Sequence, residues 1–482
     1  MTQDVDIRLT PAVRLSLLAL IVGGIAAILD STMVTLAIHT LTVRLGSSTD
    51  TIQWVVTGFL LAMAAAIPTT GWAERRLGGK RLWMAALTLF VVASVLCAAS
   101  WNDGSLIAFR SLQGVAAGLI FPLMQTLAVR AAGGHVSSRL MATISLPVAL
   151  GPVLGPVLGG VILHWLSWRW LFLVNVPVIA VGLLLAWRWL PEDRPAPQDA
   201  GSALDWTGLL LLAGGLVGIL LGLSQLSEQG GVGHIAVLLP LCAGALLLTA
   251  FVAWAVPARG RPPIVDITLL RLRSLGAAST VLFAAGAAMY AGMFLLPLYY
   301  QQVRGESVLD AGLLLIPQGV GALVSRFVVG GLVDRLGVRA VTAGSFLVAA
   351  AATLPFALAD AGTSAWWLGA VLLVRGLGIG ALLIPPMSVA YQDVQRSDIP
   401  HATMNTRISQ QVGASFGTAI VAVALQSLQA HGVVQAFDGA FWWAIGLTVV
   451  AVVPALVLPA ARSAAPTGRQ GTDTGRSPLR QR

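Results

Sequence analysis

The sequence predicts an all-α protein that crosses a membrane fourteen times, and three observations support this fold class. Of the 482 residues, 57% are hydrophobic and only 10% are charged, whereas soluble proteins average roughly 25% charged residues. The apolar residues gather in long stretches, and two groups of these stretches share sequence features. This composition excludes a disordered protein, a disulfide-rich secreted protein and a set of ordinary soluble domains.

Each apolar stretch is about as long as a membrane-spanning helix, which needs roughly 20 residues. In chain order, the predicted helices cover 13–38, 52–72, 82–100, 105–127, 140–165, 170–190, 206–226, 234–256, 276–299, 311–332, 340–359, 366–390, 403–427 and 438–460. They fall into groups of six, two and six. The first stretch is too long for the core of a signal peptide, so we expect it to remain as a membrane anchor.

The basic residues predict the orientation of these helices. Of the 29 Lys and Arg residues, 23 fall in the loops and termini of one side, Arg407 among them, and only Arg44, Arg169 and Arg304 fall in loops of the other. Cytoplasmic loops of membrane proteins carry the excess of Lys and Arg. We therefore expect a multi-pass protein of the cell membrane with both termini in the cytoplasm. Cations spread over many loops also argue against a nucleic-acid partner.

Two segments repeat after a displacement of about 260 residues. The loop after the second predicted helix and the loop after the tenth share a glycine, an acid followed by Arg, and a Leu-Gly pair. An Arg near a Gly also recurs early in the fourth and twelfth helices. The residues concerned are Gly71, Glu74, Arg75, Gly78 and Arg110 in the first copy, and Gly331, Asp334, Arg335, Gly337 and Arg375 in the second.

The repeat predicts two parallel six-helix halves with two helices inserted between them. We expect an N-terminal bundle over 1–190, a linker and two inserted helices over 191–260, a C-terminal bundle over 261–460 and a disordered cytoplasmic tail over 461–482. Two like halves related by an axis along the membrane normal are typical of transporters, whose substrate binds between the halves near the middle of the membrane.

Several motifs in this frame resemble one known family. They are residues 29–34 in the first helix, the loop 71–78, Arg110 with Gln113 and Gly114 in the fourth helix, residues 151–160 in the fifth, and Trp168 to Pro177 at the start of the sixth. Because of these motifs taken together, the sequence resembles the major facilitator superfamily and, within it, the fourteen-helix drug:proton antiporters. The resemblance covers essentially the whole chain to about residue 460. It departs from that family's pattern at Glu74, where the family has aspartate, and after Val34.

Asp30 is the only acid deep inside a predicted helix, and it is the main candidate for proton coupling. An ionisable residue within the membrane is costly and marks function by default. Helix geometry places Arg110 at a similar depth in the outer half of the membrane. We expect Asp30 to exchange a proton while Arg110 biases its protonation, and the resemblance implies the same two roles. The alternative is a permanently neutral carboxyl group that is hydrogen-bonded within its own helix.

The fifth predicted helix carries glycines at a spacing of four and two prolines. The glycines leave a bare stripe against which another helix can pack closely, and the prolines remove backbone donors. We expect a conformational hinge at the interface between the halves, with simple small-residue packing as the alternative. The hinge residues are Gly151, Pro152, Gly155, Pro156, Gly159 and Gly160.

The repeated loops predict a charge lock between the two halves, formed by Gly71, Glu74, Arg75, Gly78, Asp334 and Arg335. These charges could equally be ordinary topology signals. A mostly apolar cavity with a few polar groups would suit a lipophilic substrate. Its candidate lining residues are Gln53, Trp54, Gln113, Gln125, Tyr300, Gln301, Gln318 and Arg375, together with Asn175.

The sequence therefore predicts a proton-coupled exporter of lipophilic drugs or antibiotics that works by alternating access. The alternatives are an exporter of an endogenous metabolite, siderophore or lipid and, in a different class, a membrane-embedded enzyme or sensor. No nucleotide-binding loop, metal site or catalytic group is evident, so we expect no enzyme activity and no cofactor. We expect a monomer whose partners are the small substrate, protons and membrane lipids.

Overall fold

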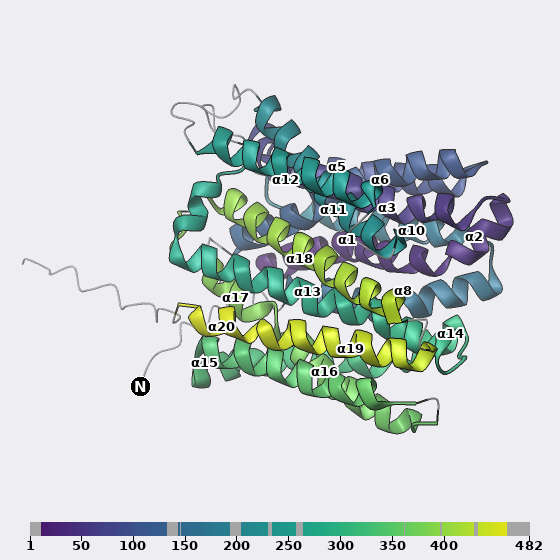
Figure 1. Cartoon of the computed structure of the whole chain (residues 1–482). Coiled ribbons are helices and arrows are strands. Elements are labelled where there is room, and N and C mark those ends of the chain that lie inside the picture. Colours follow the sequence, from purple (N-terminus) through teal and green to yellow (C-terminus); the bar gives the residue numbers. More distant parts are fainter. Residues whose placement is uncertain are drawn as a thin grey trace, which may run out of the picture.

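The computed structural model describes residues 11–132, 143–144, 146–192, 204–229, 234–256, 264–360, 362–395, 398–428 and 432–459. Within these ranges every regular element is a helix, and the long helices run side by side (Figure 1). The chain is thus all-α, as the sequence predicts.

The first group of helices follows the predicted stretches closely. Its elements are α1 (Pro11–Leu36), α2 (Ile38–Leu45), α3 (Thr49–Ala66), η1 (Ile67–Thr69), α4 (Thr70–Leu77), α5 (Gly79–Ala98), α6 (Asp103–Ala131), α8 (Leu146–Trp165), α9 (Trp170–Leu173) and α10 (Asn175–Trp189). Two of them, α3 and α6, begin with a side chain that caps the first turn. At α6, Asn102 accepts from the Ser105 backbone N–H at 2.8 Å, which satisfies a donor that the helix itself leaves free.

The inserted pair and the second group complete the chain. They are α11 (Trp206–Gln229), α12 (Ile235–Ala255), η2 (Ile267–Arg271), α13 (Arg273–Gln302), α14 (Val308–Leu314), α15 (Ile316–Thr353), η3 (Leu354–Leu358), α16 (Ala365–Ala381), α17 (Ile384–Ala390), α18 (Ile399–Leu428), α19 (Val433–Val450) and α20 (Val452–Val457).

Twelve helical segments among the described residues are long and apolar enough to cross a membrane. One of them, 309–358, is 50 residues long and contains a break at Gly337, where φ is 83°. The 20-residue helix α8 is not among the twelve. These lengths make the chain a multi-pass membrane protein.

Two glycines turn the chain between consecutive helices. Gly78 separates α4 from α5, and Gly337 interrupts α15; φ is 83° at both residues. A non-glycine residue is strained in this left-handed region. Both glycines end the repeated Leu-Gly motif, so the same sequence signal produces the same backbone turn in both places.

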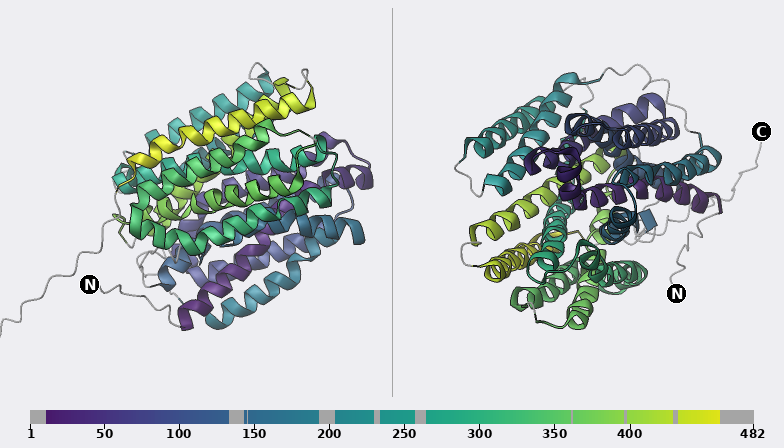
Figure 2. Two further views of the ribbon diagram at one scale, coloured as in Figure 1. Left: turned by 90° about the horizontal axis from the view of Figure 1, so that it is seen from below. Right: turned by 90° about the vertical axis from the view of Figure 1, so that its right-hand side faces the viewer.

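Helices pack in two groups with a third pair at their edge. In the first group α1 packs against α8 and α10, and α6 packs against α3 and α5; in the second, α13 packs against α18 and α15 against α16. The pair α11 and α12 contacts both groups, because α11 packs against α3 and against α18. In the right-hand view of Figure 2, the teal inserted pair lies beside the purple and blue helices, with the green and yellow helices below.

Glycines bring the backbones of neighbouring helices together at equivalent places. A Cβ atom at Gly114 of α6 would collide with the Phe59 carbonyl oxygen of α3, and one at Gly376 of α16 would collide with the Gln318 carbonyl oxygen of α15. Such close approach is how small residues drive helix association in lipid. At the first of these contacts the approach brings Arg110 of α6 against α3.

Candidate functional site

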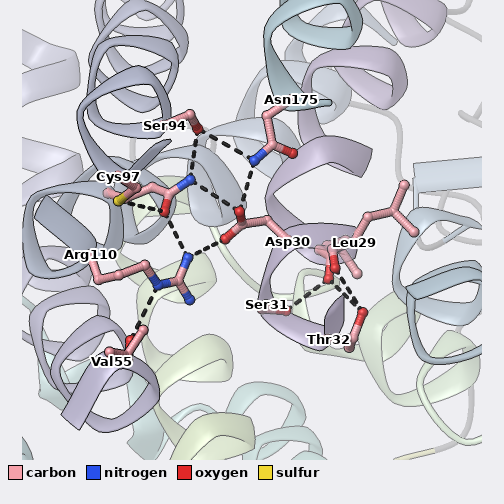
Figure 3. Close-up of polar contacts among 11 residues, drawn as sticks. Leu29, Asp30, Ser31, Thr32, Val55, Ser94, Cys97, Arg110 and Asn175 are labelled. Atoms are coloured by element: carbon pink, nitrogen blue, oxygen red, sulfur yellow. Dashed lines mark hydrogen bonds and ion pairs between the residues drawn. The ribbon is translucent and has the colours of Figure 1, made fainter. Parts of the chain in front are cut away.

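Asp30 lies on α1 with its carboxylate fully buried and surrounded by nitrogen donors (Figure 3). Its Oδ2 accepts a hydrogen bond from Arg110 Nη1 and forms an ion pair with it. Its Oδ1 accepts from Asn175 Nδ2 at 2.7 Å and from Gln113 Nε2 at 3.2 Å. The structure therefore brings together the two residues that the sequence predicts for proton coupling.

Arg110 is also fully buried, and it is held by more than the carboxylate. Its Nε donates to the Val55 carbonyl oxygen at 3.2 Å, and its Nη1 donates to Gln113 Oε1 at 2.7 Å. The guanidinium carbon lies 4.2 Å from the centre of the Phe59 ring, a cation–π distance. The cation is thus fixed against both α3 and its own helix.

A second layer supports the amide groups of this network. Ser94 Oγ on α5 accepts from Gln113 Nε2 at 2.7 Å and from Asn175 Nδ2 at 3.4 Å. Cys97 Sγ lies 3.8 Å from Gln113 Oε1, and Cys97 is a free thiol. Sequence reasoning missed Ser94 and assigned Asn175 to a cavity. The signal available for Asn175 was its place within the motif from Trp168 to Pro177, at the start of α10.

The arrangement surrounds one ionisable group with hydrogen-bond donors. Asp30 accepts from one cation and two amides, and its side chain has no exposed surface. An ionisable side chain within a membrane-spanning helix is costly and marks a functional site by default.

The glycine stripe of α8 packs mainly against α1, beside Asp30. A Cβ atom at Gly151 would collide with the Ile28 side chain, and one at Gly155 would collide with Thr32. Thr32 Oγ1 donates to the Gly151 carbonyl oxygen at 3.2 Å. Gly159 is buried, and Gly160 packs against Leu309 of α14. α8 therefore contacts α14 and α15 of the second group as well as α1, but Gly151 and Gly155 face α1, where the sequence predicts the whole stripe at the interface between the halves.

The two prolines of the predicted hinge do not break the helix. α8 continues from Leu146 to Trp165 through both positions, because a single missing donor can be tolerated within a packed membrane helix. The side chains of Pro152 and Pro156 lie outside the described residues. The hinge role stays a prediction.

The predicted charge lock differs from the contacts in the structure. Glu74 forms an ion pair with Arg130 of α6 at 3.0 Å, so its charge is balanced within the first group of helices. Asp334 and Arg335 are exposed, and no hydrogen bond or ion pair of theirs is found among the described residues. Between the described residues of the two repeated loops no ion pair is found, and the charge lock stays a prediction.

Besides α8 with α14 and α15, the contacts between the two groups include those of α4 and α6 with α18 and of α6 with α17. Arg75 Nη1 lies 3.1 Å from His401 Nε2, and a Cβ atom at Gly71 would lie 2.8 Å from the Met404 methyl carbon. Arg407 Nε donates to Gln125 Oε1 at 3.0 Å. Arg407 therefore lies within α18, two turns from its start. This position falls inside the predicted helix 403–427, although the charge count assigns Arg407 to the cytoplasmic side.

The remaining candidates for cavity residues are dispersed. Gln113 belongs to the Asp30 network, and Tyr300 is buried in an aromatic cluster, 6.4 Å from the Phe356 ring centre. Gln318 Oε1 accepts from Arg375 Nη1 at 2.6 Å. Trp54 is exposed, and Gln53 and Gln301 are partly buried. Their role in binding a substrate stays a prediction.

Comparison with known proteins identifies the family of this chain and several similar proteins. The family model described as Major Facilitator Superfamily matches residues 20–418. A protein named multidrug resistance protein B homolog, from Mycobacterium tuberculosis, is 36% identical over 409 residues, which cover 84% of this chain and 75% of that protein. The putative multidrug resistance protein MdtD of Pectobacterium carotovorum is 27% identical over 457 residues, covering 92% and 95% of the two chains.

Solved structures support the fold. The human organic anion transporter MFSD10 aligns with a TM-score of 0.63 and 17% identity, over 92% of this chain and 100% of that chain. The proton:xylose symporter XylE aligns with a TM-score of 0.65 and 14% identity, over 93% and 96%. At these identities the likeness concerns the fold alone.

Proposed function

Because this chain belongs to the Major Facilitator Superfamily, and is therefore a membrane transporter, we propose that it exports lipophilic drugs in exchange for protons. The two halves of the molecule would alternate between outward-open and inward-open states. The names of the multidrug-resistance relatives support the substrate class.

The observation that carries this proposal is the buried pair of Asp30 and Arg110. A carboxylate that is fully enclosed within the membrane is costly, and here three nitrogen donors are hydrogen-bonded to it. Asp30 is already bonded to three donors, so it is poorly placed to recognise a cationic drug as well. Its role is to carry the proton.

The membrane arrangement forms part of the proposal. If 309–358 crosses the membrane twice, on either side of Gly337, and α8 crosses once, the twelve candidate segments become fourteen spans. An even number places both termini on one side. The distribution of Lys and Arg then favours the cytoplasm for both, in the cell membrane.

The test is drug efflux from proteoliposomes under an imposed pH gradient, with wild type compared against Asp30→Asn. We expect wild type to move a fluorescent lipophilic drug when the gradient is imposed and Asp30→Asn to lose this proton-driven transport. The matched control is Asp310→Asn, which neutralises an exposed acid whose side chain accepts a hydrogen bond from Ser307, and it should keep full activity.

The outcomes separate the alternatives. Full gradient-driven efflux by Asp30→Asn would refute the coupling role. If wild type leaves drugs unmoved but transports an endogenous metabolite or lipid, the substrate class is wrong and the coupling mechanism stands.

A further inference from the structure

We propose that Asn175 is a positioning residue that follows the protonation state of Asp30 by turning its side-chain amide. In the ionised state Asn175 donates to Asp30, and in the protonated state it accepts the proton of Asp30. This inference rests on the proposed proton coupling. It assigns a function to a residue that sequence reasoning places in the substrate cavity.

The network as it stands fits only an ionised Asp30. All three groups that face the carboxylate are N–H donors: Arg110 Nη1 at Oδ2, and the amides of Asn175 and Gln113 at Oδ1. A protonated acid carries one O–H donor. The O–H of a protonated Asp30 would face an N–H donor at each of these three positions, unless one neighbour presents an acceptor in place of its donor.

Arg110 and Gln113 cannot make this change. Arg110 has no acceptor group at all. Gln113 is held in one orientation because its Oε1 accepts from Arg110 Nη1 at 2.7 Å, while its Nε2 donates to Ser94 Oγ at 2.7 Å. Turning the Gln113 amide would place an N–H against the guanidinium and lose both bonds.

Asn175 has no such restraint. No hydrogen bond to its Oδ1 is found among the described residues, so turning the amide by half a revolution breaks no bond of that atom. The oxygen would then occupy the present position of Nδ2, at 2.7 Å from Asp30 Oδ1. This is a normal distance for an acid O–H donating to a carbonyl oxygen.

Ser94 is placed to support both orientations. Its Oγ now accepts from Asn175 Nδ2 at 3.4 Å and from Gln113, and no bond in the described residues uses its own O–H. After the amide turns, that O–H can donate to Asn175 Oδ1. The proton itself stays on Asp30 Oδ1, and Asn175 gains and loses none.

Because of where Asn175 lies, rotation of its side-chain amide affects a contact between helices. Asn175 is the first residue of α10, next to Val174, which separates α9 from α10. α10 packs along α1 and α5. Protonation of Asp30 on α1 therefore changes the hydrogen bonding of the first residue of α10, which lies 145 residues away in the sequence.

The test is infrared difference spectroscopy of the full-length protein in liposomes as the pH is lowered, with asparagine isotope-labelled at its side-chain carbonyl. The chain has three asparagines, Asn102, Asn175 and Asn405, so few labelled bands can change. We expect the carboxylic acid band of Asp30 to appear together with a shift of one labelled amide band. Asp30→Asn should remove both changes.

Two variants identify the amide. Asn175→Leu should remove the labelled shift and raise the proton affinity of Asp30 by about fivefold to tenfold, because the lost bond to the charged form is stronger than the lost bond to the neutral form. Asn405→Leu is the matched control. It removes a buried amide that bonds only the Asp266 carbonyl oxygen, and it should leave both the band and the affinity unchanged.

The results distinguish this inference from the proposed function. If Asp30 takes up a proton but the labelled amide does not change in wild type, the inference is wrong and the coupling role stands. The same holds if Asn175→Leu titrates as wild type does. If no Asp30 band appears at any pH, both the inference and the coupling role fail. The measurement on labelled wild type needs no variant, so a poorly folding Asn175→Leu would not prevent the decision.

Discussion

Arg110 is the residue on which the buried charge of Asp30 depends most directly. Removing one partner of a buried ion pair leaves the other uncompensated and costs about 3 to 5 kcal/mol. We expect Arg110→Gln to lower the free energy of unfolding by about this amount, because Asp30 loses the one cationic partner that it has among the described residues. Unfolding in mixed micelles, followed by circular dichroism at neutral pH, measures the change.

The double variant Asp30→Asn, Arg110→Gln provides the control. It removes both charges, so most of the lost stability should return. Arg44→Gln removes an exposed cation of α2 and should change stability by less than about 0.5 kcal/mol. A double variant as unstable as Arg110→Gln alone would show that packing against Phe59, and not charge, dominates.

Part of this site could be predicted from sequence for a physical reason. Charges are rare within the spans, so Asp30 and Arg110 stand out, and helix geometry alone gives them similar depths. Ser94 and Asn175 are ordinary polar residues that many membrane helices contain. Their importance comes from the close packing of α1, α5, α6 and α10, which no local pattern encodes.

At the scale of elements, the tight contact of α8 with α1 links the glycine stripe to the proton site. Gly155 faces Thr32, two residues from Asp30. We expect Gly155→Ala to destabilise the protein by about 1 to 3 kcal/mol, because the added methyl group must push the two helices apart. Its transport rate in proteoliposomes should fall as well, since the α1 segment around Asp30 moves with Thr32.

Gly446→Ala tests whether the effect is specific to this contact. Gly446 lies within α19, and a Cβ atom there would meet nothing within 4 Å. This variant should be neutral or slightly stabilising, because alanine favours helix more than glycine does. Equal behaviour of the two variants would contradict a role for the contact between α8 and α1.

The elements were largely predictable because apolar length is a strong signal. The stretch 206–226 corresponds to α11, and 82–100 corresponds to α5, within a few residues. The prediction was less accurate for packing partners. A stripe of small residues shows that some helix approaches closely, but not which one, so the sequence could not place Gly151 and Gly155 against α1.

At the scale of the whole molecule, the contact of α4 with α18 joins the two groups of helices. Alternating access requires such a contact to open and close. We expect that linking Gly71→Cys to Met404→Cys with a short, cleavable thiol reagent stops transport. Transport should resume when a reductant cleaves the link, and uptake before and after cleavage measures this.

The two native cysteines need not react with the thiol reagent. Cys97 is buried, and the exposed Cys242 can be replaced by serine. The two single-cysteine proteins treated with the same reagent are the controls, and they should keep their activity. Undiminished transport by the linked protein would mean that the two groups do not separate at α4 and α18.

Among the described residues, every hydrogen-bond partner of Asp30, Arg110, Gln113 and Asn175 lies within residues 30–175. The later helices contribute nothing to that arrangement among the described residues. Under the proposed function, mutations after residue 264 can therefore alter which cargo is accepted while the proposed proton-coupling residues stay unchanged. A lineage would then gain export of a new compound without any change at the residues that we propose carry the proton.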